Sequence, residues 1–404
     1  MIHKKLLFIM VMIFAFSIIS FNVSADKVII TFDKQPTASE EASVREDGGV
    51  IKHTFKIVPA IAADVPNQKL AHLKTKKNVV RIEPDVEIMA VDTELDNTWG
   101  VKRIGAGFVH DANKFGTGIK VAIIDSGIDY NHPDLNDNFE IGLKGYDFFN
   151  NDNNPMDDNG HGTHVAGTVA AEDNNSGVVG VAPKAKLYAL KVLGANGSGN
   201  YGDVIAALQW CVNNGIQVTN NSYGSSADPG FTVHDAFDAA YTAGIINIAA
   251  AGNSGNRKGT GDNVIYPAKY NTVVAVAATD SSNKRATFSS TGPKVELSAP
   301  GVSIKSTIPG GGYAIYSGTS MASPHVAGTA ALVIASGVIG PANIRAQLQA
   351  TADNLGTPGR DSLYGYGLVD ADGAVLGTGL APPRNLAGSS SNPYTTWGAI
   401  KNSY

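Results

Sequence analysis

The sequence has little of what would place it in several other protein classes. It holds one cysteine, Cys211, in 404 residues, which excludes a framework of disulfide bonds within the chain. Only 17% of its residues are charged and the net charge is −5, so it has neither the composition of a disordered protein nor the basic surplus of a nucleic-acid-binding protein. Its 43% of hydrophobic residues and 45 glycines predict instead a globular α/β protein with many tight turns.

Residues 1–25 have the pattern of a targeting segment. A short basic start at residues 3–5 precedes an apolar run over residues 6–21, and Val23-Ser24-Ala25 follows where a signal peptidase would cut. The run is shorter than the ~20 residues that a membrane-spanning helix needs, which disfavours an anchor, and no later segment is long enough. We therefore expect a secretory signal peptide cut after Ala25, and an extracellular protein with neither membrane nor nucleic-acid partners.

Residues 26–93 have the pattern of a small α/β unit. Its elements are expected in the order β-α-β-β-α-β, at residues 27–32, 39–47, two strands within 50–63, 66–77 and 79–91. A unit this short buries a small fraction of its surface and is marginal alone. Its place between a signal and a larger body suggests a folding or inhibitory pro-segment, although composition fits an ordinary extra domain equally well.

The body of the chain, residues 94–378, alternates β-rich runs with helical stretches. This alternation predicts a mainly parallel, twisted sheet with helices on both faces. Strands are expected at 119–124, 186–192, 216–220, 245–250 and 272–277, and helices at 161–171, 202–213, 233–243 and 320–335. Because parallel sheets place their sites at the carboxyl ends of strands, Asp125 is expected to act there rather than to pack. Residues 379–404, rich in Pro, Ser and Asn, are expected to form a flexible tail.

Three polar segments carry the residue types of nucleophilic catalysis. They are Asp125-Ser126-Gly127-Ile128-Asp129, His161-Gly162-Thr163-His164-Val165-Ala166-Gly167 and Gly318-Thr319-Ser320-Met321-Ala322-Ser323-Pro324-His325. A neutral imidazole can take the proton that a serine hydroxyl must lose, and a carboxylate can orient the ring. Asp125, His161 and Ser320 supply this set. Backbone N–H groups at the helix start near Ser320 would favour a developing negative charge.

Each of these residues also has a plainer interpretation. An aspartate after a strand is commonly a turn residue, and a serine at a helix start is commonly its N-cap. His161 and His164, three residues apart on one helix, could equally hold a metal ion. No third ligand at a helical spacing accompanies the two histidines, so a zinc hydrolase is the weaker alternative.

The three segments resemble the signature motifs of the subtilisin-like serine proteases, which carry Asp, His and Ser in this order. The similarity continues through Val178-Val179-Gly180-Val181-Ala182-Pro183 and Ala249-Ala250-Ala251-Gly252-Asn253, and covers roughly residues 99–375. It implies a triad of Asp125, His161 and Ser320, with the Asn253 amide and the Ser320 N–H as oxyanion donors. Residues 26–93 resemble the inhibitory propeptide of that family, a ferredoxin-like α+β fold.

The resemblance also implies a substrate groove. An extended peptide would pair with two segments that flank the nucleophile, and the positions expected to contact it are Leu193, Gly194, Gly197, Ser222, Tyr223 and Gly224. Such Gly-rich loops also follow strands in any α/β protein. Ile265 stands where many relatives carry a small residue at the floor of the P1 pocket. A stiff β-branched side chain there predicts a preference for Leu or Met over Phe or Tyr at P1.

The family binds structural Ca²⁺, and the loop Glu172-Asp173-Asn174-Asn175-Ser176-Gly177-Val178 resembles its main calcium loop. The implied ligands are Asp134, Asn174, Ser176 and Val178, and such an oxygen-rich set suits a hard cation. The family's N-terminal ligand falls on Leu95, so Asp96 is only a candidate. A second acidic loop, with Asp152, Asp157 and Asp158, is expected to be solvated.

These features together predict a secreted, monomeric serine endopeptidase that acts on polypeptides. Its own propeptide is expected to inhibit it until the chain cleaves itself between about residues 90 and 96. A binding protein that keeps the fold without the activity is the alternative from another class. Every triad position and Asn253 are filled, which disfavours that alternative.

Overall fold

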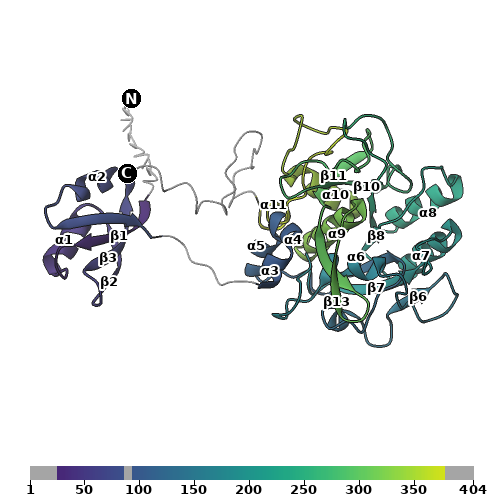
Figure 1. Ribbon diagram of the computed structural model, residues 1–404, viewed down its shortest axis with the longest axis horizontal. Helices are drawn as coiled ribbons and strands as arrows, with labels where there is room; N and C mark the ends of the chain where they lie inside the picture. Colours follow the sequence, from purple (N-terminus) through teal and green to yellow (C-terminus); the bar gives the residue numbers. More distant parts are fainter. Residues whose placement is uncertain (1–24, 86–92, 378–404) are drawn as a thin grey trace, which may run out of the picture. The chain divides into compact units, whose positions relative to one another are not determined.

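The computed structural model describes residues 25–85 and 93–377. The chain divides between Val91 and Asp92 into two compact units, which are drawn together in Figure 1. The predicted signal peptide up to residue 24, residues 90–92 of the predicted maturation region and the predicted tail lie outside the described residues. Within the described ranges no helix combines the length and the hydropathy needed to cross a membrane.

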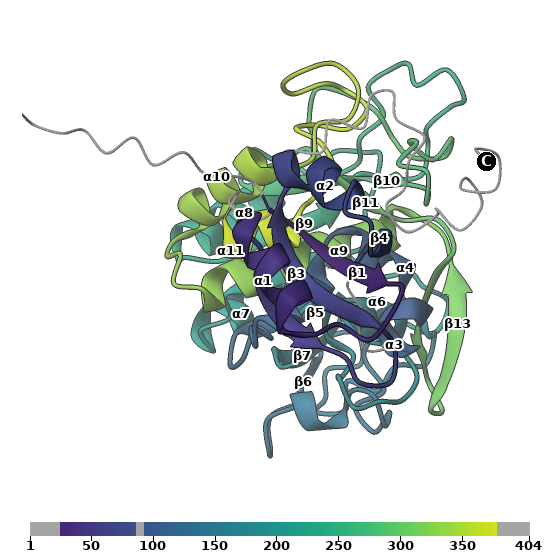
Figure 2. The same ribbon diagram turned by 90° about the vertical axis from the view of Figure 1, so that its left-hand side faces the viewer.

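The smaller unit is a four-stranded antiparallel sheet with two helices. Its elements are β1 (Ala25–Phe32), α1 (Ala38–Glu46), β2 (Val50–Thr54), β3 (Ala60–Pro66), α2 (Asn67–Lys74) and β4 (Val79–Pro84), in the predicted order of types. The strands are arranged β2-β3-β1-β4. Alternate residues of β1, Val28, Ile30 and Phe32, share one buried cluster with Val44 of α1 and Leu73 of α2. Both helices therefore cover the same face of the sheet, which Figure 2 shows from the helix side.

The larger unit is built on a 7-stranded sheet in the order β11-β10-β9-β8-β5-β7-β6. The strands are β5 (Lys120–Asp125), β6 (Gly145–Asp147), β7 (Lys186–Lys191), β8 (Val218–Asn221), β9 (Ile246–Ala250), β10 (Val273–Thr279) and β11 (Val295–Pro300). Every neighbouring pair is parallel. The predicted mainly parallel sheet is confirmed, with β6 and β11 added at its edges and β8 shifted by one or two residues from its expected bounds.

Helices cover both faces of this sheet. Val121 and Ile123 of β5 pack in one cluster with α6 (His161–Ala170) and α9 (Thr319–Ala335). Ala122 and Ile124 of the same strand pack with α7 (Tyr201–Asn213) and α8 (Phe231–Thr242), where Cys211 is also buried. The remaining elements are α3 (Thr93–Asn97), α4 (Trp99–Arg103), α5 (Ala106–Asp111), η1 (Asn136–Asn138), the hairpin β12 (Ile304–Ile308) and β13 (Gly312–Tyr316), α10 (Pro341–Thr351) and α11 (Ala371–Leu376).

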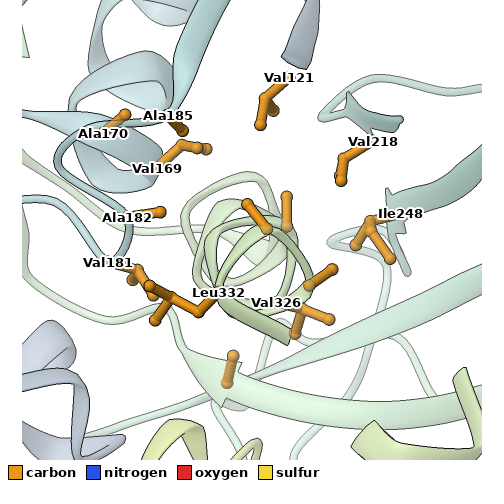
Figure 3. Packing of buried hydrophobic residues seen from close by; sticks show 14 of the residues in the cluster. Val121, Val169, Ala170, Val181, Ala182, Ala185, Val218, Ile248, Val326 and Leu332 are labelled. Carbon is orange, nitrogen blue, oxygen red and sulfur yellow. The ribbon is translucent and has the colours of Figure 1, made fainter. Parts of the chain in front are cut away.

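The apolar helix α9 lies at the centre of the first cluster. Figure 3 looks along a helix with Val326 and Leu332 labelled, and Val121, Val218 and Ile248 of three adjacent strands surround one side of it. Because α9 is buried along most of its length, its position against the sheet is fixed by packing. This packing anchors the helix whose first turn carries Ser320.

Candidate active site

Asp125 and His161 form a hydrogen-bonded pair. Asp125 ends β5 and is fully buried, whereas the His161 side chain, first in α6, is 28% exposed. His161 Nδ1 lies 2.8 Å from Asp125 Oδ1 and 3.0 Å from Oδ2. The N–H of Ser126 donates to Asp125 Oδ1 at 2.7 Å, so the carboxylate is itself fixed. This carboxylate orients the ring with Nε2 directed away from it.

The electrostatic surroundings favour the protonated form of His161. Burial of the ring lowers the pKa of His161, but the charge and hydrogen bond of Asp125, with a smaller contribution from Asp157, outweigh it. The pKa of His161 is therefore raised above the ordinary value of 6.5. Protonation of this group is expected to control activity near neutral pH.

Ser320 lies in the first turn of α9 and is linked twice to Ser222. Its hydroxyl donates to the Ser222 carbonyl oxygen at 3.0 Å, and the Ser222 hydroxyl donates to the Ser320 carbonyl oxygen at 2.9 Å. Ser222 and His161 in turn line the same cavity. The serine hydroxyl is thus bonded to a backbone oxygen in the resting arrangement, and a rotation about its Cα–Cβ bond would be needed to bring it to an imidazole nitrogen.

Asn253 follows β9 and is anchored beside the start of α9. Its Oδ1 accepts from the N–H of Thr319 at 2.9 Å and from the Thr319 hydroxyl at 3.0 Å. These two bonds fix the orientation of the amide: Thr319 occupies its oxygen, and its Nδ2 group can donate to another acceptor. A Cβ built on Gly318 would lie 3.5 Å from Asn253 Nδ2 and 3.7 Å from the Ser320 nitrogen. Two donors therefore flank one small region of space, the arrangement that binds an oxyanion.

His164 is oriented differently from His161. It is buried, stacks on Tyr316 with ring centroids 4.3 Å apart, and places Nε2 near the carbonyl oxygens of Ile304 and Ala314 at 3.1 and 3.2 Å. Burial lowers the pKa of His164 to about 4. Nδ1 of His161 is meanwhile bonded to Asp125. The two histidines therefore have separate partners, and a zinc site shared by them has no support from the geometry.

A cavity of about 420 Å³ adjoins His161. Most residues predicted to contact substrate line it, namely Leu193, Gly197, Ser222, Tyr223 and Gly224. Residues that were not predicted also line it: Asn159, Ser198, Gly199, Asn200, Tyr201, Val204 and Ser225. Tyr201 and Val204 belong to α7, whose apolar pattern gave no sign that part of it faces a cavity. The structure thus gathers residues that follow β7 and β8, together with α7, around one hollow beside the imidazole.

Gly194 and Ile265 do not line that cavity. The Phe149 ring covers Gly194, since a Cβ there would lie 2.6 Å from the ring. Ile265 packs between two glycines instead: Cβ atoms on Gly224 and Gly252 would lie 2.7 and 2.9 Å from its side chain. The isoleucine side chain therefore fills the space between the segments after β8 and β9.

The expectation of a solvated acidic loop is wrong for Asp157. Its side chain is buried, with 5% of the residue exposed, and its carboxylate accepts from Ser126 Oγ at 2.8 Å and from Thr163 Oγ1 at 2.6 Å. Asp158 is half exposed and pairs with Lys191, whose ammonium is buried and also donates to the Ser126 carbonyl oxygen. Sequence reasoning missed Asp157 and Lys191 because their partners come from other segments.

The predicted calcium loop closes around two buried carboxylates. Asp134 accepts from Asn174 Nδ2 at 3.1 Å, from the Val178 N–H at 3.1 Å and from the Tyr313 hydroxyl at 2.9 Å. Glu94 of α3 was not predicted, yet its side chain reaches the same loop and accepts from the Ser176 N–H at 2.6 Å. In the part of the chain that the structure describes, no group of three or more His, Cys, Asp or Glu side chains is placed to hold a metal ion.

Glu94, rather than Asp96, brings the N-terminal segment to this loop. Asp96 pairs with Lys102 at 2.5 Å. Burial raises the pKa of Glu94 against the opposing effect of the loop N–H groups. Two buried carboxylates fit a hard cation in charge and in ligand type, although the loop groups that contact them are N–H donors. The Asn174 amide, however, turns its NH₂ group and not its oxygen toward Asp134.

Comparisons with known proteins give this geometry a context. The sequence profile of the subtilase family matches residues 116–367. The chain is 40% identical to subtilisin J of Geobacillus stearothermophilus over 384 residues, 92% of this chain and 98% of that protein. It is 42% identical over 348 residues to the thermostable alkaline protease of Halalkalibacterium halodurans, 86% of this chain and 91% of that protein. It is 39% identical over 363 residues to an alkaline protease of Shouchella clausii, 89% and 90% of the two chains.

Proposed function

Because the chain belongs to the subtilase family and is a serine endopeptidase, we propose that Asp125, His161 and Ser320 are its catalytic triad. The observation that carries the proposal is the 2.8 Å bond between His161 Nδ1 and the Asp125 carboxylate. A carboxylate on Nδ1 keeps the proton on that nitrogen and leaves Nε2 free to accept another, which is the state a general base needs.

The reaction begins when the Ser320 hydroxyl turns from the Ser222 carbonyl toward His161 Nε2. The oxygen attacks the peptide carbonyl carbon while its proton passes to Nε2. His161 then gives this proton to the leaving nitrogen as the C–N bond breaks, and an acyl-enzyme remains on Ser320. A water molecule then attacks the acyl carbon and gives a proton to His161 Nε2. The ester bond to Ser320 breaks as Ser320 takes that proton back, and the second product is released. Asp125 keeps its charge throughout and stabilises the imidazolium.

Negative charge on the attacked carbonyl oxygen is stabilised by Asn253 Nδ2 and the Ser320 N–H. Thr319 already holds the amide oxygen of Asn253, so little reorganisation is needed when the charge develops. The N–H of Ser320 belongs to the first turn of α9, where backbone donors have no partner within the helix. One such donor contributes roughly 3 kcal/mol to lowering the barrier.

The substrate is an extended polypeptide that pairs with the segments after β7 and β8, through Leu193 and Gly197 on one side and Ser222, Tyr223 and Gly224 on the other. Gly194, which the Phe149 ring covers, is not among these contacts. The apolar walls of the cavity beside His161 favour hydrophobic side chains upstream of the cleaved bond. At P1, Ile265 shortens the pocket and favours Leu or Met over Phe or Tyr, since its side chain lies against Gly224 and Gly252.

The chain is made as a secreted precursor. Residues 1–25 direct export, and residues 26–93 act as an inhibitory propeptide, for which the small independent core of the first unit is a suitable scaffold. Self-cleavage between about residues 90 and 96 separates this unit from the enzyme. Ca²⁺ would be held by Asp134 and by the loop residues Asn174, Ser176 and Val178, with Glu94 adding negative charge.

The decisive experiment compares secreted wild type with Ser320→Ala by N-terminal sequencing, intact mass and hydrolysis of a peptide series. Wild type is expected to lose residues up to about 93 and to cleave peptides, whereas Ser320→Ala keeps the first unit and cleaves none. Ser336→Ala is the matched control, because this serine is exposed at the far end of the same helix.

The other outcomes separate the alternatives. If both proteins stay full length and inactive, a binding protein that keeps the fold becomes the better interpretation. If both are trimmed, another protease performs the maturation, and the triad is judged on peptide hydrolysis alone. Hydrolysis by Ser320→Ala at the wild-type rate contradicts the proposed triad.

A further inference from the structure

Asp157 is a buried carboxylate that the mechanism above does not use. Its Oδ1 accepts from Ser126 Oγ at 2.8 Å and from the N–H groups of Asn159 and Gly160 at 3.0 and 2.9 Å. Its Oδ2 accepts from the N–H and the hydroxyl of Thr163 at 2.9 and 2.6 Å. A carboxylate with so many donors and 5% exposure is a fixed point of the structure and not a surface charge.

These bonds cap the start of α6, the helix that carries His161. The Gly162 N–H donates to Ser126 Oγ at 2.9 Å, and the Ser126 hydroxyl donates in turn to Asp157 Oδ1. The Thr163 N–H donates to Asp157 directly. Two of the orphan donors in the first helical turn are thus satisfied by Asp157 or by the serine that it holds.

Ser126 is also the residue that follows Asp125 and donates its N–H to the Asp125 carboxylate. Asp157 is therefore bonded, through Ser126 on one side and Thr163 on the other, to both segments that carry the hydrogen-bonded pair. We propose that Asp157 is a positioning residue that fixes the Asp125 turn against the His161 helix and so sets the distance between carboxylate and imidazole. The inference rests on the triad proposed above.

The charge of Asp157 has a second effect. The titratable groups that shift the pKa of His161 are Asp125 and Asp157, and His161 itself lowers the pKa of His164 in the same helix. Burial lowers the pKa of His161, and the two carboxylates raise it, Asp125 more than Asp157. Removal of the Asp157 charge therefore lowers the pKa of His161. Since the general base must be unprotonated, half-maximal activity on the acid side then moves to lower pH.

The test measures kcat and KM of the secreted enzyme from about pH 5 to 9 for wild type, Asp157→Asn and Asp152→Asn. Asp157→Asn is expected to lower kcat about 10- to 100-fold with KM little changed, because misplacement of a catalytic group by 1 Å or less has effects of that size. Its acid limb is expected at lower pH than in wild type. Asp152→Asn removes an equal charge from an exposed position in the same loop and should match wild type.

Ser126→Ala separates geometry from charge. It breaks the bridge to Gly162 but keeps the Asp157 carboxylate, so kcat should fall while the acid limb stays where it is. If Asp157→Asn is not secreted in folded form, Ser126→Ala decides, and a wild-type kcat in that variant overturns the inference. A wild-type kcat and pH profile in Asp157→Asn does the same. An active Ser320→Ala would instead overturn the triad, which distinguishes the two failures.

Discussion

Gly162 of α6 lies against the backbone of Gly127. A Cβ on Gly162 would come 2.1 Å from the Gly127 carbonyl oxygen and 3.2 Å from the Asp125 Cβ. Only a residue without a side chain permits this approach, and His161 is its neighbour in the chain. The short Asp125–His161 bond therefore depends on a glycine that takes no part in the chemistry.

Gly162→Ala is expected to separate the two segments and to lower kcat by about 100-fold or more. Because backbone stands opposite the new methyl group, the free energy of unfolding should also fall, by about 1–3 kcal/mol. Peptide hydrolysis and urea unfolding measure the two effects. Gly202→Ala in the first turn of α7 is the control, since no atom lies within 4 Å of its added Cβ, and it should be neutral or stabilising by about 0.5–1 kcal/mol. Equal behaviour of the two variants would contradict this account.

The parts of the site that the sequence predicts are those that sit at element boundaries. Asp125 ends a buried apolar strand, and His161 and Ser320 begin helices, so local pattern marks all three. The same logic predicted the central strands of the sheet. Short edge strands such as β6, with three residues, have too few residues for a period to show.

The parts that escaped prediction depend on contacts between distant segments. Asp157 stands in an Asn- and Asp-rich stretch that is typical of a solvated loop, and two of the donors that hold its buried carboxylate, Ser126 and Thr163, come from outside that stretch. Glu94 was missed because the resemblance without insertions or deletions places the family's N-terminal ligand at Leu95. In the structure the short helix α3 directs the side chain of Glu94 to the loop. Local composition shows neither that Asp157 is buried nor in which direction α3 turns the side chain of Glu94.

Ile265→Gly is expected to deepen the P1 pocket. Removal of a side chain that lies against Gly224 and Gly252 creates room for an aromatic ring. The ratio of kcat/KM for P1 Phe over P1 Leu should rise by 10-fold or more, within the roughly 1–3 kcal/mol that apolar pockets discriminate. Ile265→Val, which keeps the branch and removes one methyl group, should change the ratio far less. A wild-type preference for Phe, or no change on Ile265→Gly, would contradict the assigned role.

Calcium removal is expected to destabilise the larger unit through the loop at Asp134. In an inactive Ser320→Ala background, chelator should lower the free energy of unfolding by about 3–4 kcal/mol if Ca²⁺ was present at 100 to 1,000 times its Kd. Asp134→Asn should be less stable and insensitive to chelator. Asp173→Asn, an exposed carboxylate of the same loop, should keep the response. A wild-type Tm that chelator leaves unchanged would show that the loop's own hydrogen bonds suffice.

His325 and His164 are expected to make the fold sensitive to acid. Both are buried, each has one ring nitrogen without a hydrogen-bond partner among the described residues, and burial lowers the pKa of each to about 4. The unfolded chain, with an ordinary histidine pKa near 6.5, therefore binds more protons than the native protein between about pH 6.5 and 4. The contribution of these two histidines to the free energy of unfolding should be constant above pH 7 and fall as pH decreases through that window. His161, whose pKa is raised above 6.5, contributes stability that is complete below about pH 6.5 and is lost as pH rises above it, so it adds no slope within that window.

His325→Asn tests this dependence, because the amide can still donate to the Met321 carbonyl that His325 Nδ1 contacts at 2.8 Å. In the Ser320→Ala background, which prevents self-digestion, urea unfolding at about pH 7.5, 6 and 5 should show a lower stability at pH 7.5 but a shallower loss on acidification. The slopes differ because unfolded wild type binds a proton at His325 that the native state does not bind, whereas asparagine binds no proton in either state of the variant. His234→Asn, at a partly exposed position paired with Asp238, should keep the wild-type slope. An unchanged slope in His325→Asn would mean that carboxylates, and not this buried ring, govern the acid response.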